Sequence, residues 1–421
     1  MEVNRLLKRG LCAILIVGLL GLGVAVGAVA ASKVNVTFWH AMSSVNQDTL
    51  KALANEFMQD HPGIQITLVY QGGYGDLATK LLSATAAGNP PVMAQMYEDD
   101  TMKYLEAGAL LPLGDQISSS ILSDLPQALI DDNTFEVNGK EVMETVPFNK
   151  SAMILFYNTD LLKTPPTTWD ELLQDAKSLT VDTNGDGTPD QYGFGIRPYT
   201  EFYIEFFRQA GGQIFNADWS KCTVNSDAGI QAMDYLLKLK PYSLYQSQYL
   251  SDPFGNGKVA MYIGSSAGMS FVGSASKGHH GWATAPLPAG PMNGGSILQG
   301  TNIGVFNLGT TQAQRDAAVQ FIDFLLSKKA TLQWAEDTGY VPILKSDITD
   351  PEWTNFVADH PTYEAPVQMM KQWFVYPNQQ NMYNIRQEIE TAFEQVMLGK
   401  SDPQAALDAA AQTIDNQYLG S

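Results

Sequence analysis

The chain has 421 residues, of which 45% are hydrophobic and 16% charged, and its formal net charge is −19. This length allows two or more domains, and the composition excludes a disordered or collagen-like protein. The strong negative charge disfavours nucleic acid and anionic lipid as partners.

The first thirty residues have the pattern of a secretory leader. Arg5, Lys8 and Arg9 precede a long apolar stretch, which ends in small residues over 28–30 that a signal peptidase accepts. We therefore predict a signal peptide over residues 1–30, cleaved after Ala30, and a periplasmic or otherwise extracytoplasmic mature protein. An uncleaved membrane anchor is the alternative, because the stretch is long enough to span a bilayer. Beyond the leader Cys222 stands alone, which excludes an intrachain disulfide.

Strand-like and helix-like segments alternate after the leader. Alternating apolar residues predict strands over 34–42, 64–73 and 92–100, and helical spacing predicts helices over 47–63 and 76–91 between them. This order is typical of a parallel sheet with crossover helices. Ligands of such sheets bind beyond the carboxyl ends of the strands.

A second α/β region follows. A helix is predicted over 167–180, with Thr168 as its N-cap and acidic residues in its first turn. From residue 311 onward the sequence is mainly helical. Further strands are predicted over 151–162, 257–268 and 299–309. The order of these segments predicts two interleaved α/β lobes, between which the chain passes more than once.

The segment DTNGDGTPD, residues 182–190, matches the first nine positions of a calcium loop. The twelfth position holds Gly193 in place of the usual glutamate, so a distant carboxylate would have to complete the shell. The alternative is a tight turn without metal. Candidate ligands of a structural Ca²⁺ are Asp182, Asn184, Asp186, Thr188 and Asp190. No other cofactor is predicted.

The segment GSSAG, residues 264–268, fits the G-x-S-x-G pattern of an esterase nucleophile and follows a predicted strand. Ser266 would be the nucleophile, and His360 is the one histidine in the required chain order. No oxyanion-hole segment lies upstream. We predict instead a loop whose hydroxyls and backbone N–H groups meet the oxygens of a ligand, and a secreted serine esterase is the distant alternative.

Several segments in chain order carry a resemblance to a known family. The sequence resembles the extracellular solute-binding proteins of ABC importers, a group that includes maltose-binding protein, and within it the members that bind glycerol 3-phosphate and glycerophosphodiesters. The segments are FWHAM, YQGGYGDL, GNPPVMAQMYE, PFNKSAMILFYN, TTWDELL, KVAMYIGSS, EDTGYVPI, NIRQEIE and GKSDPQAALDAA.

This resemblance implies a fold and a mode of action. The fold is that of a type II periplasmic binding protein, with two α/β lobes joined by crossing hinge strands and a ligand cleft between them. The predicted lobes are residues 31–146 with 303–345, and 147–302 with 346–421. The protein would be a monomer that catalyses no reaction and that delivers its ligand to an ABC membrane permease.

The resemblance also implies ligand-binding residues. One departure from the family lies in residues 195–207, where the family has tryptophans and this chain has tyrosine and phenylalanine together with Arg197. That departure affects the alcohol portion of the ligand more than the phosphate. The matched positions are Tyr74, Glu98, Ser151, Ser265, Gly300, Tyr340 and Arg386.

The residue types at these positions suit a phosphorylated polyol. A phosphate in a dry cleft needs a planar cation, hydroxyl donors and free backbone N–H groups, and Arg386 is the cation. Glu98 would accept hydrogen bonds from glycerol hydroxyls. Two alternatives stay open: Arg386 forms a surface ion pair with Glu388 or Glu390, or the cleft binds a neutral di- or oligosaccharide and Arg386 pairs with an acidic residue.

Overall fold

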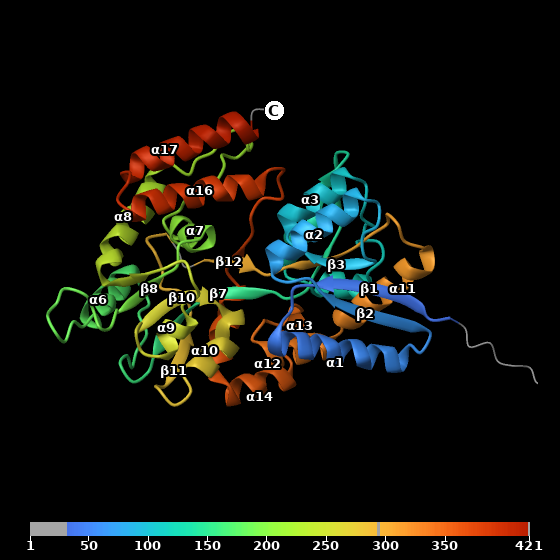
Figure 1. The fold of residues 1–421 in the computed structure, drawn as a ribbon, viewed down its shortest axis with the longest axis horizontal. Coiled ribbons are helices and arrows are strands. Elements are labelled where there is room, and N and C mark those ends of the chain that lie inside the picture. Colours follow the sequence, from blue (N-terminus) through green and yellow to red (C-terminus); the bar gives the residue numbers. More distant parts are fainter. Residues whose placement is uncertain (1–31, 293–294, 420–421) are drawn as a thin grey trace, which may run out of the picture. The chain divides into compact units, whose positions relative to one another are not determined.

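The computed structural model describes residues 32–292 and 295–419, so the predicted leader lies outside the described residues. Two sheets organise the chain (Figure 1). No helix in the described ranges combines the length and the apolar character needed to cross a membrane. The first sheet has the order β2-β1-β3-β13-β6, and the second has the order β14-β12-β7-β10-β8-β9 with β11 added on β7.

The strands of the first sheet are β1 (Val34–His40), β2 (Ile64–Tyr70), β3 (Met93–Met96), β6 (Val146–Pro147) and β13 (Asn302–Val305). Those of the second are β7 (Ser151–Asn158), β8 (Phe194–Ile196), β9 (Ser243–Tyr245), β10 (Met261–Ser265), β11 (Trp282–Ala285), β12 (Ser296–Gln299) and β14 (Trp373–Phe374). A separate hairpin pairs β4 (Thr134–Val137) with β5 (Lys140–Met143).

The helices up to β13 are α1 (Ser44–Asp60), α2 (Tyr74–Ala86), α3 (Glu98–Glu106), α4 (Ser119–Asp124), α5 (Gln127–Asn133), α6 (Trp169–Ser178), α7 (Thr200–Gln209), α8 (Asp227–Leu239), α9 (Ser251–Gly255) and α10 (Met269–Ala275). Those after β13 are α11 (Gln312–Leu325), α12 (Lys328–Thr338), α13 (Lys345–Ile348), α14 (Pro351–Asp359), α15 (Glu364–Met370), α16 (Met382–Met397) and α17 (Pro403–Ile414). Short 3₁₀ or π turns are η1 (Lys240–Tyr242), η2 (Ser266–Gly268), η3 (Pro361–Tyr363) and η4 (Asp415–Leu419).

The first sheet has the predicted parallel core. Strand β1 pairs in parallel with both β2 and β3, whereas β13 pairs with β3 and β6 in the antiparallel direction. Alternate side chains of β1 enter different clusters: Val36 and Phe38 pack with residues of α1 and α11, and Trp39 packs beside Leu81 of α2. Helices α1 and α2 accordingly lie on opposite faces of this sheet (Figure 1).

The second sheet is mixed in direction. Strand β7 is antiparallel to β10, β11 and β12, whereas β8 runs parallel to β10 and β9. Its largest apolar cluster includes most of helix α7, whose Phe202, Tyr203, Phe206 and Phe207 are buried against the sheet and against Phe393 of α16. The aromatic run that replaces the family's tryptophans is therefore mainly core.

Two short segments carry the chain directly from a strand of one sheet to a strand of the other, and a longer, mainly helical stretch does so again between β13 and β14. Residues 148–150 join β6 of the first sheet to β7 of the second, and residues 300–301 join β12 of the second to β13 of the first. Gly300 has φ +103°, and a Cβ there would lie 1.9 Å from the carbonyl oxygen of Asn149. Only glycine fits this contact. Within the predicted strand over 299–309, residue 299 is the last of β12 and residues 302–305 form β13. The predicted lobe limits stay predictions.

Most predicted elements of the mature chain are present. Helix α6 begins after Thr168, whose hydroxyl accepts a hydrogen bond from the N–H of Glu171 at 3.2 Å, as the capping pattern predicts. The prediction for residues 92–100 was wrong at its end. Strand β3 stops at Met96, and Glu98 is the first residue of helix α3. Three consecutive acidic residues there face the positive end of the helix dipole, which favours a helix start.

Candidate ligand-binding site

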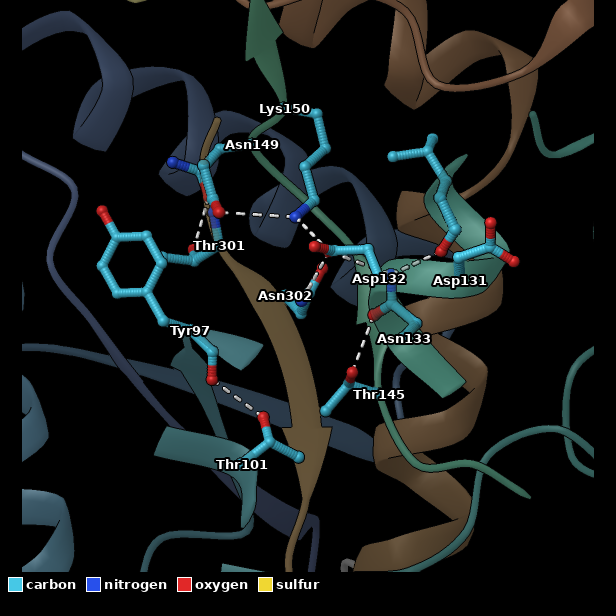
Figure 2. Close-up of polar contacts among 12 residues, drawn as sticks. Tyr97, Thr101, Asp131, Asp132, Asn133, Thr145, Asn149, Lys150, Thr301 and Asn302 are labelled. Atoms are coloured by element: carbon cyan, nitrogen blue, oxygen red, sulfur yellow. Dashed lines mark hydrogen bonds and ion pairs between the residues drawn. The ribbon is translucent and has the colours of Figure 1, made fainter. Parts of the chain in front are cut away.

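Asn149, in the segment between β6 and β7, contacts strand β3 of the first sheet and Thr301 of the other crossing segment; the contact with Thr301 is drawn in Figure 2. Its side-chain oxygen accepts hydrogen bonds from Gln95 Nε2 at 3.2 Å and from the hydroxyl of Thr301 at 2.5 Å. Its amide nitrogen donates to the hydroxyls of Tyr74 and Tyr340, each at 2.9 Å. One amide therefore fixes the two predicted tyrosines, and sequence reasoning missed it.

The next residue, Lys150, forms a buried ion pair. Its ammonium lies 2.7 Å from the carboxylate of Asp132 and donates to the carbonyl oxygen of Gly300 at 3.3 Å (Figure 2). The same carboxylate accepts from Asn302 Nδ2 at 2.9 Å. Lys150 ends one crossing segment, and Asn302 begins β13 directly after the other, so Asp132 holds the chain at both crossings close together.

The predicted tyrosines lie together. The hydroxyls of Tyr74 and Tyr340 are 3.4 Å apart, and the ring of Tyr97 lies 5.3 Å from that of Tyr74. Burial raises the pKa of Tyr74 and of Tyr340 above the ordinary value, so both hydroxyls remain protonated near neutral pH and can donate.

The predicted serines form a second pair. Ser151 and Ser265 stand at the ends of β7 and β10, and their hydroxyl oxygens are 2.8 Å apart. Ser265 Oγ also accepts from the N–H of Ala267 at 3.2 Å. The neighbouring Ser266, proposed above as an alternative nucleophile, is fully buried, and its hydroxyl accepts from the N–H of Ala152 at 3.4 Å.

Arg386 is paired with two carboxylates that the sequence analysis did not identify. Nη1 donates to Asp99 Oδ2 at 3.2 Å, and Nη2 donates to Glu201 Oε1. The predicted alternative partners were wrong, since Glu390 instead accepts from the N–H and hydroxyl of Thr200. Asp99 belongs to α3 and Glu201 to α7, so the guanidinium links elements that pack with different sheets.

Two donors beside these ion pairs have no hydrogen-bond partner among the described residues. They are Arg386 Nε and the hydroxyl of Tyr376, whose ring lies 4.9 Å from the guanidinium carbon. Buried polar groups are normally satisfied. Both groups can therefore take an additional acceptor without breaking an existing bond.

Glu98 lies in the same buried region. Burial raises the pKa of its carboxyl to about 8, and the carboxylates of Asp132 and Asp99 act in the same direction. Arg386 opposes this shift. Near neutral pH Glu98 is mostly protonated, and its carboxyl group can then both donate to and accept from a polyol hydroxyl.

We expect Glu98→Gln to remove a pH-dependent loss of stability. Since folding raises the pKa of Glu98 from 4.5 to about 8, the folded protein holds an extra proton between these values. The stabilisation from that proton is complete below the lower value and is lost as pH rises through the upper one. Urea unfolding from about pH 5 to about pH 9 should show a larger fall in unfolding free energy for wild type than for the variant. Equal falls would contradict this assignment.

The predicted calcium loop is held by its own side chains. The carboxylate of Asp182 accepts from the N–H groups of Gly185 and Gly187 at 2.7 and 2.9 Å, and that of Asp190 accepts from the N–H of Thr183 at 2.8 Å. Across residues 32–292 and 295–419, no group of three or more His, Cys, Asp or Glu side chains is arranged to hold a metal ion. Calcium binding stays a prediction.

The sequence-predicted site residues thus form one connected region. Tyr74 and Tyr340 meet through Asn149, the two serines meet each other, and Gly300 packs on Asn149. Arg386 pairs with the residue next to Glu98. Asp99, Glu201, Asn149 and Tyr376 complete the region. Of these, Asp99 had a sequence signal, since it follows Glu98 in the acidic start of α3.

The two sheets, the crossing segments and this buried polar junction define a two-lobed ligand-binding protein of the type II periplasmic class. The model of the bacterial extracellular solute-binding protein family matches residues 52–365. The chain therefore belongs to this family. The predicted fold class and family are confirmed.

Named relatives extend over nearly the whole chain. The sn-glycerol-3-phosphate-binding periplasmic protein UgpB of Escherichia coli K12 is 25% identical over 95% of this chain and 96% of its own length. The protein of the same name from Yersinia enterocolitica is also 25% identical, over 98% of this chain and 97% of its own length.

Solved structures share the fold. The cyclic alpha-maltosyl-1,6-maltose binding protein from Arthrobacter globiformis has a TM-score of 0.80 at 23% identity and covers 93% of this chain and 100% of its own. UgpB from Mycobacterium tuberculosis in complex with glycerophosphocholine has a TM-score of 0.76 at 18% identity and covers 90% of this chain and 97% of its own.

Proposed function

We propose that this protein captures sn-glycerol 3-phosphate or a glycerophosphodiester and delivers it to the membrane permease of an ABC importer. The observation that carries the proposal is the position of Arg386 between α3 and α7, where neither its Nε nor the neighbouring hydroxyl of Tyr376 has a hydrogen-bond partner among the described residues. The E. coli and Y. enterocolitica relatives are named for binding sn-glycerol 3-phosphate, which supports a phosphorylated polyol as the ligand.

In the proposed complex, the protein offers hydrogen-bond donors to the phosphate end of the ligand and a carboxyl group to its glycerol end. Arg386 Nε and the hydroxyl of Tyr376 donate to the phosphate, because charge-assisted bonds from a planar cation suit its oxygens. Glu98 exchanges hydrogen bonds with the glycerol hydroxyls. Further donors to the ligand are Tyr74, Tyr340, Ser151, Ser265 and the backbone N–H of Gly300.

Closure of the two lobes would couple capture to delivery. A ligand bound at Arg386 Nε contacts a residue whose guanidinium is hydrogen-bonded both to Asp99 of α3 and to Glu201 of α7. Only a closed arrangement makes all of these contacts, so the ligand shifts the population toward it. The permease would recognise that closed form.

A neutral di- or oligosaccharide is the second candidate ligand. The observation that favours it is the pairing of Arg386 with Asp99 and Glu201, which already compensates the guanidinium charge. A site with this excess of carboxyl groups suits hydroxyl-rich ligands without charge. The A. globiformis protein is named for binding a cyclic maltosyl-maltose, which agrees with this candidate.

Titration calorimetry with sn-glycerol 3-phosphate and with maltose separates the two candidates. Binding of the phosphate ester, with weak or no binding of maltose, is the expected result. Binding of maltose alone would exclude the phosphate proposal. Native mass spectrometry of the protein as purified would show the mass of any ligand that it retains.

We infer that the protein catalyses no ester hydrolysis. Full burial of Ser266 and its bond to the backbone of Ala152 leave its hydroxyl poorly placed to attack a substrate. An assay with a chromogenic ester checks this, using Ser266→Ala as the control. Turnover by wild type that the variant lacks would overturn the inference.

We also propose that residues 1–30 direct export and are removed, and that the mature protein acts outside the cytoplasmic membrane as a monomer. The family and the periplasmic relatives support the location. Mass measurement of the exported protein would give the cleavage point. Light scattering would give the oligomeric state.

Calcium binding at the loop over 182–190 is a further proposal. We expect millimolar Ca²⁺ to raise the midpoint of thermal unfolding, because a ligand that binds only the folded state stabilises it. Asp186→Asn should abolish this rise while leaving the midpoint in chelator unchanged. No shift in wild type with Ca²⁺ would show that the segment is a turn without metal.

A further inference from the structure

A second arginine, Arg197, lies at the edge of the second sheet. Strands β8, β9 and β10 run parallel, so their carboxyl ends share one edge. Arg197 follows the end of β8, Tyr249 follows β9 by four residues, and Ser265 is the last residue of β10. Ligands of α/β sheets bind beyond such ends.

Two tyrosine rings enclose the guanidinium of Arg197. Its central carbon lies 4.8 Å from the ring centre of Tyr199 and 4.3 Å from that of Tyr249. Nε donates to the carbonyl oxygen of Ser247 at 3.2 Å. None of the ion pairs found in the described ranges includes Arg197, whereas Arg386 has two carboxylate partners. Its charge is therefore uncompensated by a direct partner.

Arg197 is connected to the candidate ligand-binding site. The hydroxyl of Tyr199 lies 3.5 Å from the sulfur of Met153, which is the register partner of Ser265. The residue after Tyr199, Thr200, donates its hydroxyl to the carbonyl oxygen of Arg386 at 3.0 Å. The start of α7 thus lies between the two arginines.

Arg197 already occupies one face of each tyrosine ring at this position. A quaternary ammonium group such as choline is recognised by aromatic faces that a cation can approach. The guanidinium of Arg197 already contacts the rings of Tyr199 and Tyr249 within the distance of a cation–π interaction. A second cation beside these rings would meet the positive charge of Arg197. An anionic group would meet a cation without a carboxylate partner.

We propose that Arg197, held between Tyr199 and Tyr249, is a specificity-determining residue that selects a phosphate monoester and disfavours a choline diester. This inference rests on the proposed function and assigns its substrate class. A doubly charged monoester gains more from an uncompensated cation than a zwitterionic diester does. Arg386 alone cannot supply this difference in affinity, because Asp99 and Glu201 already compensate its charge.

The test compares sn-glycerol 3-phosphate with glycerophosphocholine by calorimetry. Arg197→Gln should weaken binding of the monoester about tenfold or more, as expected for loss of one charge-assisted hydrogen bond. Binding of the choline diester should change less or become stronger. Arg197→Lys, which keeps the charge, should retain most of the preference. Arg315→Gln, on an arginine that donates to Thr310 and Gln312 away from this sheet edge, is the matched control and should have no effect.

Three outcomes would overturn the inference. An Arg197→Gln protein that binds the monoester like wild type shows that Arg197 contacts no phosphate, although the proposed function stands. Equal weakening of both ligands, with a lowered unfolding midpoint, shows a structural role only. Failure of wild type to bind either phosphate compound excludes the proposed function and this inference together.

Discussion

Arg386→Gln protein should lose most of its affinity for sn-glycerol 3-phosphate. The guanidinium is largely enclosed, with 20% of its side chain exposed, and its free Nε is the proposed phosphate donor. Truncating one partner of a buried charged contact costs about 2–5 kcal/mol, which corresponds to a loss of about thirtyfold to several thousandfold in affinity. Titration calorimetry on wild type and variant measures this loss directly.

The carboxylate partners of Arg386 require a second variant. Removal of the guanidinium leaves Glu201 and Asp99 without their cation, and these charges would themselves repel a phosphate. In the double variant Arg386→Gln with Glu201→Gln, one repulsive charge is removed. If Arg386 contacts the ligand, affinity stays low. Recovery to the wild-type value would show that Arg386 serves only to neutralise Glu201, and full affinity in the single variant would exclude a phosphate contact.

The sequence predicts those parts of the fold that local patterns specify. The strands around Phe38 and Leu68, the helix capped by Thr168 and the parallel pairing of β1 with its neighbours follow from periodicity and capping. The end of β3 was misplaced because Tyr97 extends the largely apolar stretch of β3 up to the acidic residues. The run of acidic residues that begins a helix there was the better signal.

The partners of the site could not be predicted in the same way. Arg386 meets Asp99 across 287 positions and Glu201 across 185, and no local pattern encodes such contacts. Sequence reasoning considered Glu388 and Glu390 because they are near along the helix. Asn149 was overlooked because an asparagine in a connecting segment can have many roles. Its role becomes evident only in the structure, where its amide nitrogen donates to the hydroxyls of both Tyr74 and Tyr340.

Ion pairs between cations and carboxylates occur both in the candidate site and at the crossing segments. Within the described residues, the largely enclosed Arg386 and the buried Lys150 each have carboxylate partners, and these ion pairs join separate elements. Arg197 lacks such a partner. Among the described residues, Lys150 and Arg386 thus join separate elements at the junction, whereas Arg197 forms no ion pair.

Lys150→Met should destabilise the protein strongly. Lys150 and Asp132 are 1% and 5% exposed, and the ammonium is 2.7 Å from the carboxylate. Without the lysine, Asp132 would remain buried. Its carboxylate would keep hydrogen bonds from the side chains of Asn302 and Asn133, but no cation (Figure 2). Breaking a buried pair on one side costs about 3–5 kcal/mol. Urea unfolding at pH 7 measures the change in unfolding free energy.

Two further variants separate the ion pair from other effects of the substitution. Lys329→Met removes the partner of Glu56 in an exposed pair and should cost no more than about 1 kcal/mol. The double variant Lys150→Met with Asp132→Leu removes both buried charges and should recover much of the lost stability, because apolar replacements of a buried pair are often neutral. If the double variant were as unstable as Lys150→Met alone, the cost would come from lost packing around the crossing segments. The buried charge of Asp132 would then have no part in it.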